Sequence, residues 1–258
     1  MKQLESHLRK LRSEGRKALV PYFMAGLTPD WTQYVQAAAH AGADAIEIGI
    51  PFSDAMIDGV VIQEAALRSL DAGTTVDSIC SELANLDIGV PLIAMTYYNI
   101  FHHYGVEKAC GVMRQVGIVG TIVPDLSIEE SGEWKQACDS NDIANIFLVA
   151  PSTTPERFTR ITSETEGFCY ASARMAVTGQ SADEGDAQQV VEKIRAVSDV
   201  PALVGIGITT PEQARQTSLV SDGVIVGSVL VKSILDGASV VDIEEHIRSF
   251  RNAIDTVN

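Results

Sequence analysis

Eight short apolar runs, rich in Val and Ile, alternate with segments of helical periodicity along this 258-residue chain. Such alternation indicates a parallel sheet, because each helix carries the chain back to the start of the next strand. Eight units with no linker or break in composition predict a single (β/α)8 TIM barrel domain over residues 1–258, and an open doubly wound sheet is the alternative. The predicted strands are 18–25, 45–50, 91–97, 120–125, 145–150, 168–172, 201–208 and 223–228.

An extra helix is predicted before the first strand, where Leu4, Leu8 and Leu11 lie at helical spacing. We expect its apolar face to cover the bottom of the barrel. Further helices are expected at 31–42, 61–73 and 211–219. The last of them begins with an N-cap and first-turn pair, Thr210 and Pro211.

Charge and composition exclude several classes of partner. The chain carries 34 Asp and Glu against 19 Lys and Arg, a net charge of −15. Such a surface repels nucleic-acid phosphates and anionic lipid, so neither a nucleic acid nor a membrane is a predicted partner. The N-terminus lacks the apolar segment of a signal peptide, which predicts a cytoplasmic protein. Four cysteines without a CxxC pair predict no metal site and no disulfide framework.

One carboxylate lies inside the second predicted strand, "AIEIGI". Alternation places Ile46 and Ile48 on the helix-facing side and Glu47 on the side of the barrel interior, next to the small Gly49. A buried carboxylate without a partner has a raised pKa, which suits a general acid or base near neutral pH. The alternative is a structural ion pair, but none of the eight runs contains Lys or Arg.

Two aspartates follow in the loop after this strand, and loops after strands form the active face of a barrel. Asp54 is a candidate for a helix cap or turn. Asp58 is a candidate catalytic residue, although Asp58-Gly59 is also typical of a plain turn. Spacing alone leaves both alternatives open.

Glycines at the ends of the last two strands indicate a phosphate site. Gly205 and Gly207 end the seventh strand, and Gly227 with Ser228 ends the eighth, each before a predicted helix. Free amides and the positive end of a helix dipole bind phosphate without basic side chains. An acidic chain can thus bind a phosphorylated substrate, although glycines also serve turns.

The segment 170–186 follows the sixth strand and is rich in small and polar residues, which predicts a lid over the active face. Tyr170 lies within that strand, and a core aromatic is its default interpretation.

Several stretches together resemble the α subunit family of tryptophan synthase. They occur in the family's order and span residues 18–232: "IEIGIPFSDAMIDGVVIQ", "MTYYN", "VPDLSIEES", "VTG", "VGIGITTPEQA" and "DGVIVGSVLVK". The resemblance implies a barrel that cleaves indole-3-glycerol phosphate to indole and glyceraldehyde 3-phosphate without a cofactor or metal. It also implies an α2β2 complex whose β subunit consumes the indole.

The resemblance assigns roles residue by residue. Glu47 would shuttle protons between the indole ring and the glycerol hydroxyl, and Asp58 would accept a hydrogen bond from the indole N–H and stabilise the cation formed on protonation. The positions that correspond to substrate-binding residues of the family are Tyr170, Thr178, Gly179, Gly207, Gly227 and Ser228.

The chain departs from the family pattern in its loops. Four positions that are usually proline, and one before "VTG" that is commonly glycine, are Ala55, Val60, Ile100, Ser127 and Ala176. Proline stiffens an unbound loop, so these loops should sample more conformations, with altered lid ordering and coupling to β.

Three alternatives remain open. One is an isomerase that acts on another phosphorylated intermediate; the Glu47–Asp58 pair together with "VPDL" disfavours it. Another is a catalytically weak module that mainly activates a β subunit. The third is a stand-alone lyase that releases indole without a partner.

Overall fold

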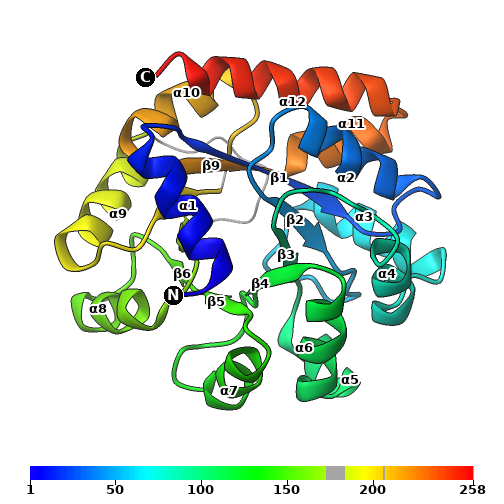
Figure 1. Cartoon of the computed structure of the whole chain (residues 1–258), viewed down its shortest axis with the longest axis horizontal. Helices are drawn as coiled ribbons and strands as arrows, with labels where there is room; N and C mark the ends of the chain where they lie inside the picture. The colour runs from blue at the N-terminus through cyan, green and yellow to red at the C-terminus, as the bar shows by residue number, and fades with distance from the viewer. Residues whose placement is uncertain (173–183, 206, 258) are drawn as a thin grey trace.

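The computed structural model describes residues 1–172, 184–205 and 207–257. Nine strands in these residues pair in parallel in the order β5-β4-β3-β2-β1-β9-β8-β7-β6 (Figure 1). The strands are β1 Ala18–Met24, β2 Ile46–Gly49, β3 Leu92–Met95, β4 Ile118–Ile122, β5 Ala144–Ile146, β6 Leu148–Val149, β7 Cys169–Ala171, β8 Ala202–Val204 and β9 Gly223–Val226.

The sheet closes into a barrel at the fifth predicted strand. β5 and β6 stand at the two ends of the strand order, yet only Phe147 separates them in the chain. β5 pairs with β4 and β6 pairs with β7, so this short segment completes the ring. The predicted (β/α)8 barrel is confirmed. The single strand expected at 145–150 is two strands, because the pairing passes from one neighbour to the other at Phe147.

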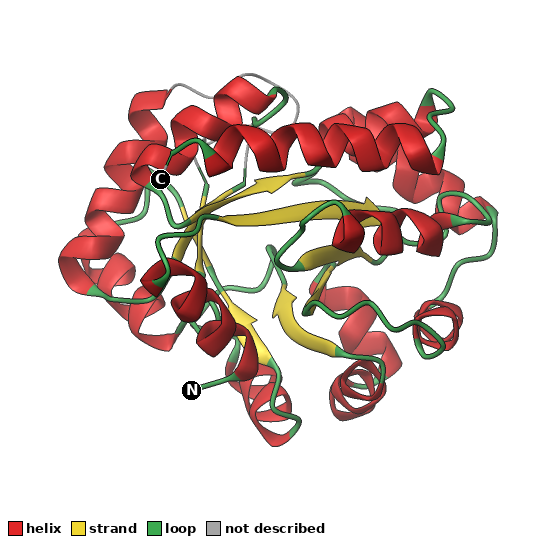
Figure 2. Cartoon of the chain, turned by 45° about the horizontal axis from the view of Figure 1, so that its top comes forward, coloured by secondary structure: helices red, strands yellow, loops and turns green. Residues whose placement is uncertain are grey.

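Twelve helices among the described residues surround the strands (Figure 2). Three predicted helices are confirmed as α2, α3 and α10. Thr210 is the N-cap of α10, and its hydroxyl accepts from the backbone N–H of Gln213 in a capping box. The helices are α1 Gln3–Ser13, α2 Trp31–His40, α3 Val60–Asp71, α4 Val76–Leu83, α5 Tyr98–Tyr104, α6 Val106–Gln115, α7 Gly132–Ser140, α8 Pro155–Glu164, α9 Glu184–Val197, α10 Pro211–Val220, α11 Ser228–Leu235 and α12 Val240–Asp255.

The N-terminal helix α1 closes the end of the barrel at which the strands begin. Its three leucines are buried in one cluster with residues at or just before strand starts, among them Ala18, Ala45 and Phe168. The expected cover on the bottom of the barrel is confirmed. None of the helices in the described ranges is long and apolar enough to span a membrane.

Removal of the Leu4 side chain tests this closure. Leu4→Ala should lower the free energy of unfolding by about 2–4 kcal/mol, because a fully buried leucine leaves a cavity that its neighbours fill only in part. Chemical denaturation measures the change. Leu67→Ala on α3 is the matched control, since Leu67 is 51% exposed and should shift the value by less than about 0.5 kcal/mol. Equal values for the two variants would contradict the role given to α1.

Candidate active site

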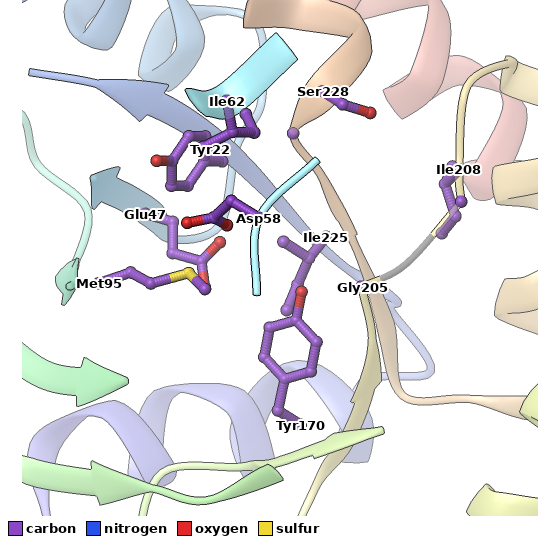
Figure 3. Close-up of a pocket in the computed structure, with 12 residues that line it drawn as sticks. Tyr22, Glu47, Asp58, Ile62, Met95, Tyr170, Gly205, Ile208, Ile225 and Ser228 are labelled. Carbon is purple, nitrogen blue, oxygen red and sulfur yellow. The ribbon is translucent and has the colours of Figure 1, made fainter. Parts of the chain in front are cut away.

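A pocket of about 490 Å³, including its open mouth, lies at the ends of the strands away from α1 (Figure 3). Strands β1, β2, β3, β7 and β9 contribute to it, as do the loop after β2, the helix α3 and the segments after β8 and β9. The lining residues are Tyr22, Glu47, Asp58, Ile62, Met95, Tyr170, Gly205, Gly207, Ile208, Ile225, Gly227 and Ser228.

Glu47 projects from β2 into this pocket, as strand alternation predicted. The side chain is only 1% exposed, and its Oε1 has no hydrogen-bond partner among the described residues. Burial, together with the nearby charge of Asp58, raises the pKa of Glu47 to about 8. No Lys or Arg of the described residues forms an ion pair with Glu47, in contrast to the structural ion pair considered above. At neutral pH the carboxyl mainly carries its proton.

Asp58 reaches the same pocket from the loop between β2 and α3, and Figure 3 shows its carboxylate beside that of Glu47. The Tyr97 hydroxyl donates a hydrogen bond to Asp58 Oδ2 at 2.9 Å and accepts one from the backbone N–H of Ile57 at 3.0 Å. Burial raises the pKa of Asp58, whereas the Tyr97 hydrogen bond acts in the opposite direction. The two carboxyls thus have different surroundings, which favours different protonation states.

The sequence did not predict the contact of Tyr97 with Asp58. Its only signal was its place in "MTYYN", at the end of a predicted strand, where side chains reach the active face. Asp54, in contrast, lies outside the pocket in an exposed turn, where it accepts a hydrogen bond from the Ser53 hydroxyl at 2.6 Å. This position agrees with the turn interpretation of Asp54.

Two tyrosines reach the pocket because glycines on neighbouring strands leave room for their rings. A Cβ atom on Gly205 would lie 2.0 Å from the Tyr170 hydroxyl oxygen, and one on Gly49 would lie 2.0 Å from that of Tyr22. Burial holds the pKa of both tyrosines well above the ordinary value, so both remain hydrogen-bond donors at neutral pH. Gly205 therefore serves the packing of Tyr170, and Tyr22 takes the space that Gly49 leaves.

The predicted phosphate residues Gly207, Gly227 and Ser228 also line the pocket. Gly227 is the N-cap of α11 and has no side chain that could cap the helix. The N–H groups of Ser228 and Val229 have no partner among the described residues, so α11 presents these two donors and a positive dipole end here. The start of α10 is already closed by its Thr210 capping box. Thr178 and Gly179, with Ala176, lie outside the described residues.

A second, smaller pocket of about 290 Å³, including space open to solvent, adjoins the first and shares Tyr22, Asp58 and Met95 with it. Apolar and aromatic side chains dominate its lining, and the rings of Phe52 and Tyr97 lie 5.1 Å apart. This arrangement suits a flat apolar ring with one polar edge directed at Asp58. Across the described ranges, no group of three or more His, Cys, Asp or Glu side chains is placed to hold a metal ion.

Comparison with known proteins identifies similar chains. A family model described as tryptophan synthase alpha chain matches residues 8–255. The tryptophan synthase alpha chain of Thermobifida fusca is 40% identical over 97% of this chain and 95% of its own. That of Streptomyces coelicolor is 39% identical over 90% and 88%.

Solved structures that superpose on this chain belong to the same family. A structure of Mycobacterium tuberculosis tryptophan synthase superposes with a TM-score of 0.92 at 33% identity and covers 98% of both chains. Tryptophan synthase subunit alpha from Legionella pneumophila superposes with a TM-score of 0.90 at 30% identity and covers 99% of both.

Proposed function

We propose, from the premise that this chain belongs to the tryptophan synthase alpha chain family, that Glu47 and Asp58 are the catalytic pair of a lyase. The reaction is the cleavage of indole-3-glycerol phosphate to indole and glyceraldehyde 3-phosphate, in the cytoplasm and in the service of tryptophan biosynthesis. The observation that carries the assignment is the buried carboxyl of Glu47, unpartnered in the described residues and set beside Asp58 in a pocket.

Glu47 acts first as an acid and then as a base. Protonated Glu47 delivers its proton to C3 of the indole ring, which makes the ring a cation. The resulting carboxylate takes the proton of the glycerol hydroxyl next to the scissile bond. As that C–O becomes C=O, the C–C bond breaks and its electrons return to the ring. Glu47 ends the cycle with its proton restored, which a pKa near 8 permits at neutral pH.

Asp58 stabilises the charge that appears on the ring. Its carboxylate accepts a hydrogen bond from the indole N–H, and a fixed negative charge there lowers the energy of the indole cation. The smaller pocket beside Asp58 accommodates the ring, between Phe52, Met95 and Tyr97. The Tyr97 hydroxyl keeps the carboxylate charged and in place.

The phosphate lies at the opposite side of the pocket. Gly207 and Gly227 offer backbone amides, Ser228 offers its hydroxyl, and α11 adds the positive end of its dipole. Thr178 and Gly179, carried over from the family pattern, belong to the same binding set in our proposal, as does Tyr170 with its buried hydroxyl. No cofactor is required for this chemistry.

A β subunit docks on the mouth of the barrel in an α2β2 complex. The loop before α3 and the first residue of that helix expose three apolar side chains beside the pocket, which we call the mouth patch: Met56, Ile57 and Val60, exposed by 74%, 40% and 77%. Grouped apolar exposure of this kind is typical of a partner surface. Structures of related whole tryptophan synthases include a chain that superposes on this one, which supports the choice of partner.

Charge introduced into the mouth patch tests the docking. Val60→Asp should weaken binding to a tryptophan synthase β subunit by about tenfold or more. The new carboxylate would lose its hydration when the partner covers the mouth patch, and this loss opposes binding. An acidic residue in the first turn of α3 suits the helix dipole, so the fold should be retained. Val241→Asp is the matched control, because Val241 is also an exposed valine in the first turn of a helix, α12. Equal weakening by both variants, or by neither, would contradict the assignment.

Indole release from indole-3-glycerol phosphate by the purified chain, alone and with a β subunit, tests the function. We expect release in both cases, raised by β. Strong release that β does not change would favour the stand-alone lyase. No release under either condition from a folded chain would overturn the lyase assignment and leave the partner-module alternative.

A further inference from the structure

The loop between β2 and α3 carries two features on opposite sides. Asp58 faces the pocket, and the mouth patch faces outward. Neither of the prolines usual in the family pattern is present here, since position 55 in the loop is Ala and position 60, the first residue of α3, is Val. Pro51 restricts only the start of the loop, so the stiffness of the turn at 55–58 must come from contacts.

Gln63, in the first turns of α3, supplies such contacts. Its side-chain Nε2 donates to the backbone carbonyl of Asp58 at 2.9 Å and to that of Ala55 at 3.1 Å. The Asp58 N–H also donates to the Ala55 carbonyl at 3.2 Å, which closes a turn over 55–58. Both partners of Gln63 are carbonyl acceptors, so only the NH2 group of its amide can face them and the orientation of the amide is fixed.

We infer that Gln63 is a positioning residue that holds the Asp58 turn in its productive geometry. The inference rests on the role proposed for Asp58. Gln63 bonds to the first and last residues of the turn at once, so the turn moves as one body with the start of α3. Few other side chains could replace it: Glu lacks the donor, Asn is one methylene shorter, and Leu has neither donor nor acceptor. Tyr97 fixes the Asp58 carboxylate, whereas Gln63 fixes its backbone.

The test is Gln63→Leu, read by two measurements on the full chain. Turnover of indole-3-glycerol phosphate should fall about tenfold in kcat with little change in KM, because a small misplacement of a catalytic group lowers the rate of chemistry more than binding. Hydrogen exchange at the Asp58 amide should become about tenfold faster, because the turn opens more often. The melting temperature should stay close to that of the wild type, since Gln63 is only half-buried.

A double variant separates positioning from general damage. Ala55→Pro in the Gln63→Leu background should recover most of the lost kcat, because proline restricts the turn directly and no described hydrogen bond uses the Ala55 N–H. Gln188→Leu is the matched control: Gln188 donates to Glu192 on the surface of α9 and its loss should change neither reading. If Gln63→Leu does not fold, Gln63→Asn replaces it.

The outcomes are distinct. Unchanged kcat and unchanged exchange in Gln63→Leu, beside an active wild type, would overturn the inference and leave the proposed function intact. A wild type that releases no indole would overturn the proposed function, and the exchange rates would still decide whether Gln63 holds the turn.

Discussion

Glu47→Gln should lower indole release by about 10³-fold and at the same time stabilise the folded chain at pH 8. Glutamine keeps the size of the side chain but can neither give a proton to the ring nor take one from the hydroxyl, and a general acid–base group typically contributes 10²–10⁴-fold. Indole release and thermal unfolding of the same preparation measure the two effects.

The sign of the stability change follows from the raised pKa. Glu47 titrates at about 4.5 when unfolded and at about 8 when folded, so between these values the folded chain holds a proton that the unfolded chain has lost. Stability therefore falls as pH rises from about 5 to 8, and the full penalty is present above the folded pKa. Glutamine removes this penalty, which amounts to about 2–4 kcal/mol at pH 8.

Glu64→Gln is the matched control, since Glu64 is an exposed glutamate on α3 paired only with Arg68 in the described residues. It should leave both indole release and the pH dependence of stability unchanged. A Glu47→Gln variant that keeps its activity would remove Glu47 from the mechanism. A wild type that is active only above pH 8, where Glu47 has lost its proton, would contradict its acid role.

Asp58→Asn should lower kcat by about 10²–10³-fold, the usual loss when one preorganised charge partner is removed from a transition state. Asparagine keeps the shape and can still accept the Tyr97 hydrogen bond through its carbonyl, so the variant removes the charge alone. Assays of the isolated chain across pH provide the measurement. Asp54→Asn in the same loop is the control, because Asp54 lies outside the pocket and its loss should cost less than about threefold.

The pH profile adds a second reading of the same assignment. The Tyr97 hydrogen bond lowers the pKa of Asp58, so Tyr97→Phe should move the acidic limb of activity to higher pH, where Asp58 regains its charge. An unmoved limb, or full activity in Asp58→Asn, would show that the charge of Asp58 is not used.

Much of the site could be predicted from strand alternation. The period of two residues alone places Glu47 on the inner face, and the loop after a barrel strand places Asp58 at the active face. Glycines at the ends of the last two strands indicated Gly207, Gly227 and Ser228, and the resemblance to a family added a substrate-binding role for Tyr170. The structure places all four in the pocket lining.

Features that depend on contacts between strands could not be predicted. The break of the fifth strand at Phe147 follows from pairing with two different neighbours. The packing of Tyr22 over Gly49 depends on the register of β1 against β2, and the Tyr97 hydrogen bond to Asp58 joins residues 39 apart in the chain. Periodicity within one segment carries no information on any of these.

The leucines of α1 determine the route by which substrate and product reach the pocket. Leu4, Leu8 and Leu11 fill one end of the barrel, so the pocket opens only at the other end of the described barrel. The phosphorylated substrate must enter and the indole must leave through the same opening, and the mouth patch lies beside that opening. A partner docked on the mouth patch, as we propose, would therefore lie across the route by which the product leaves.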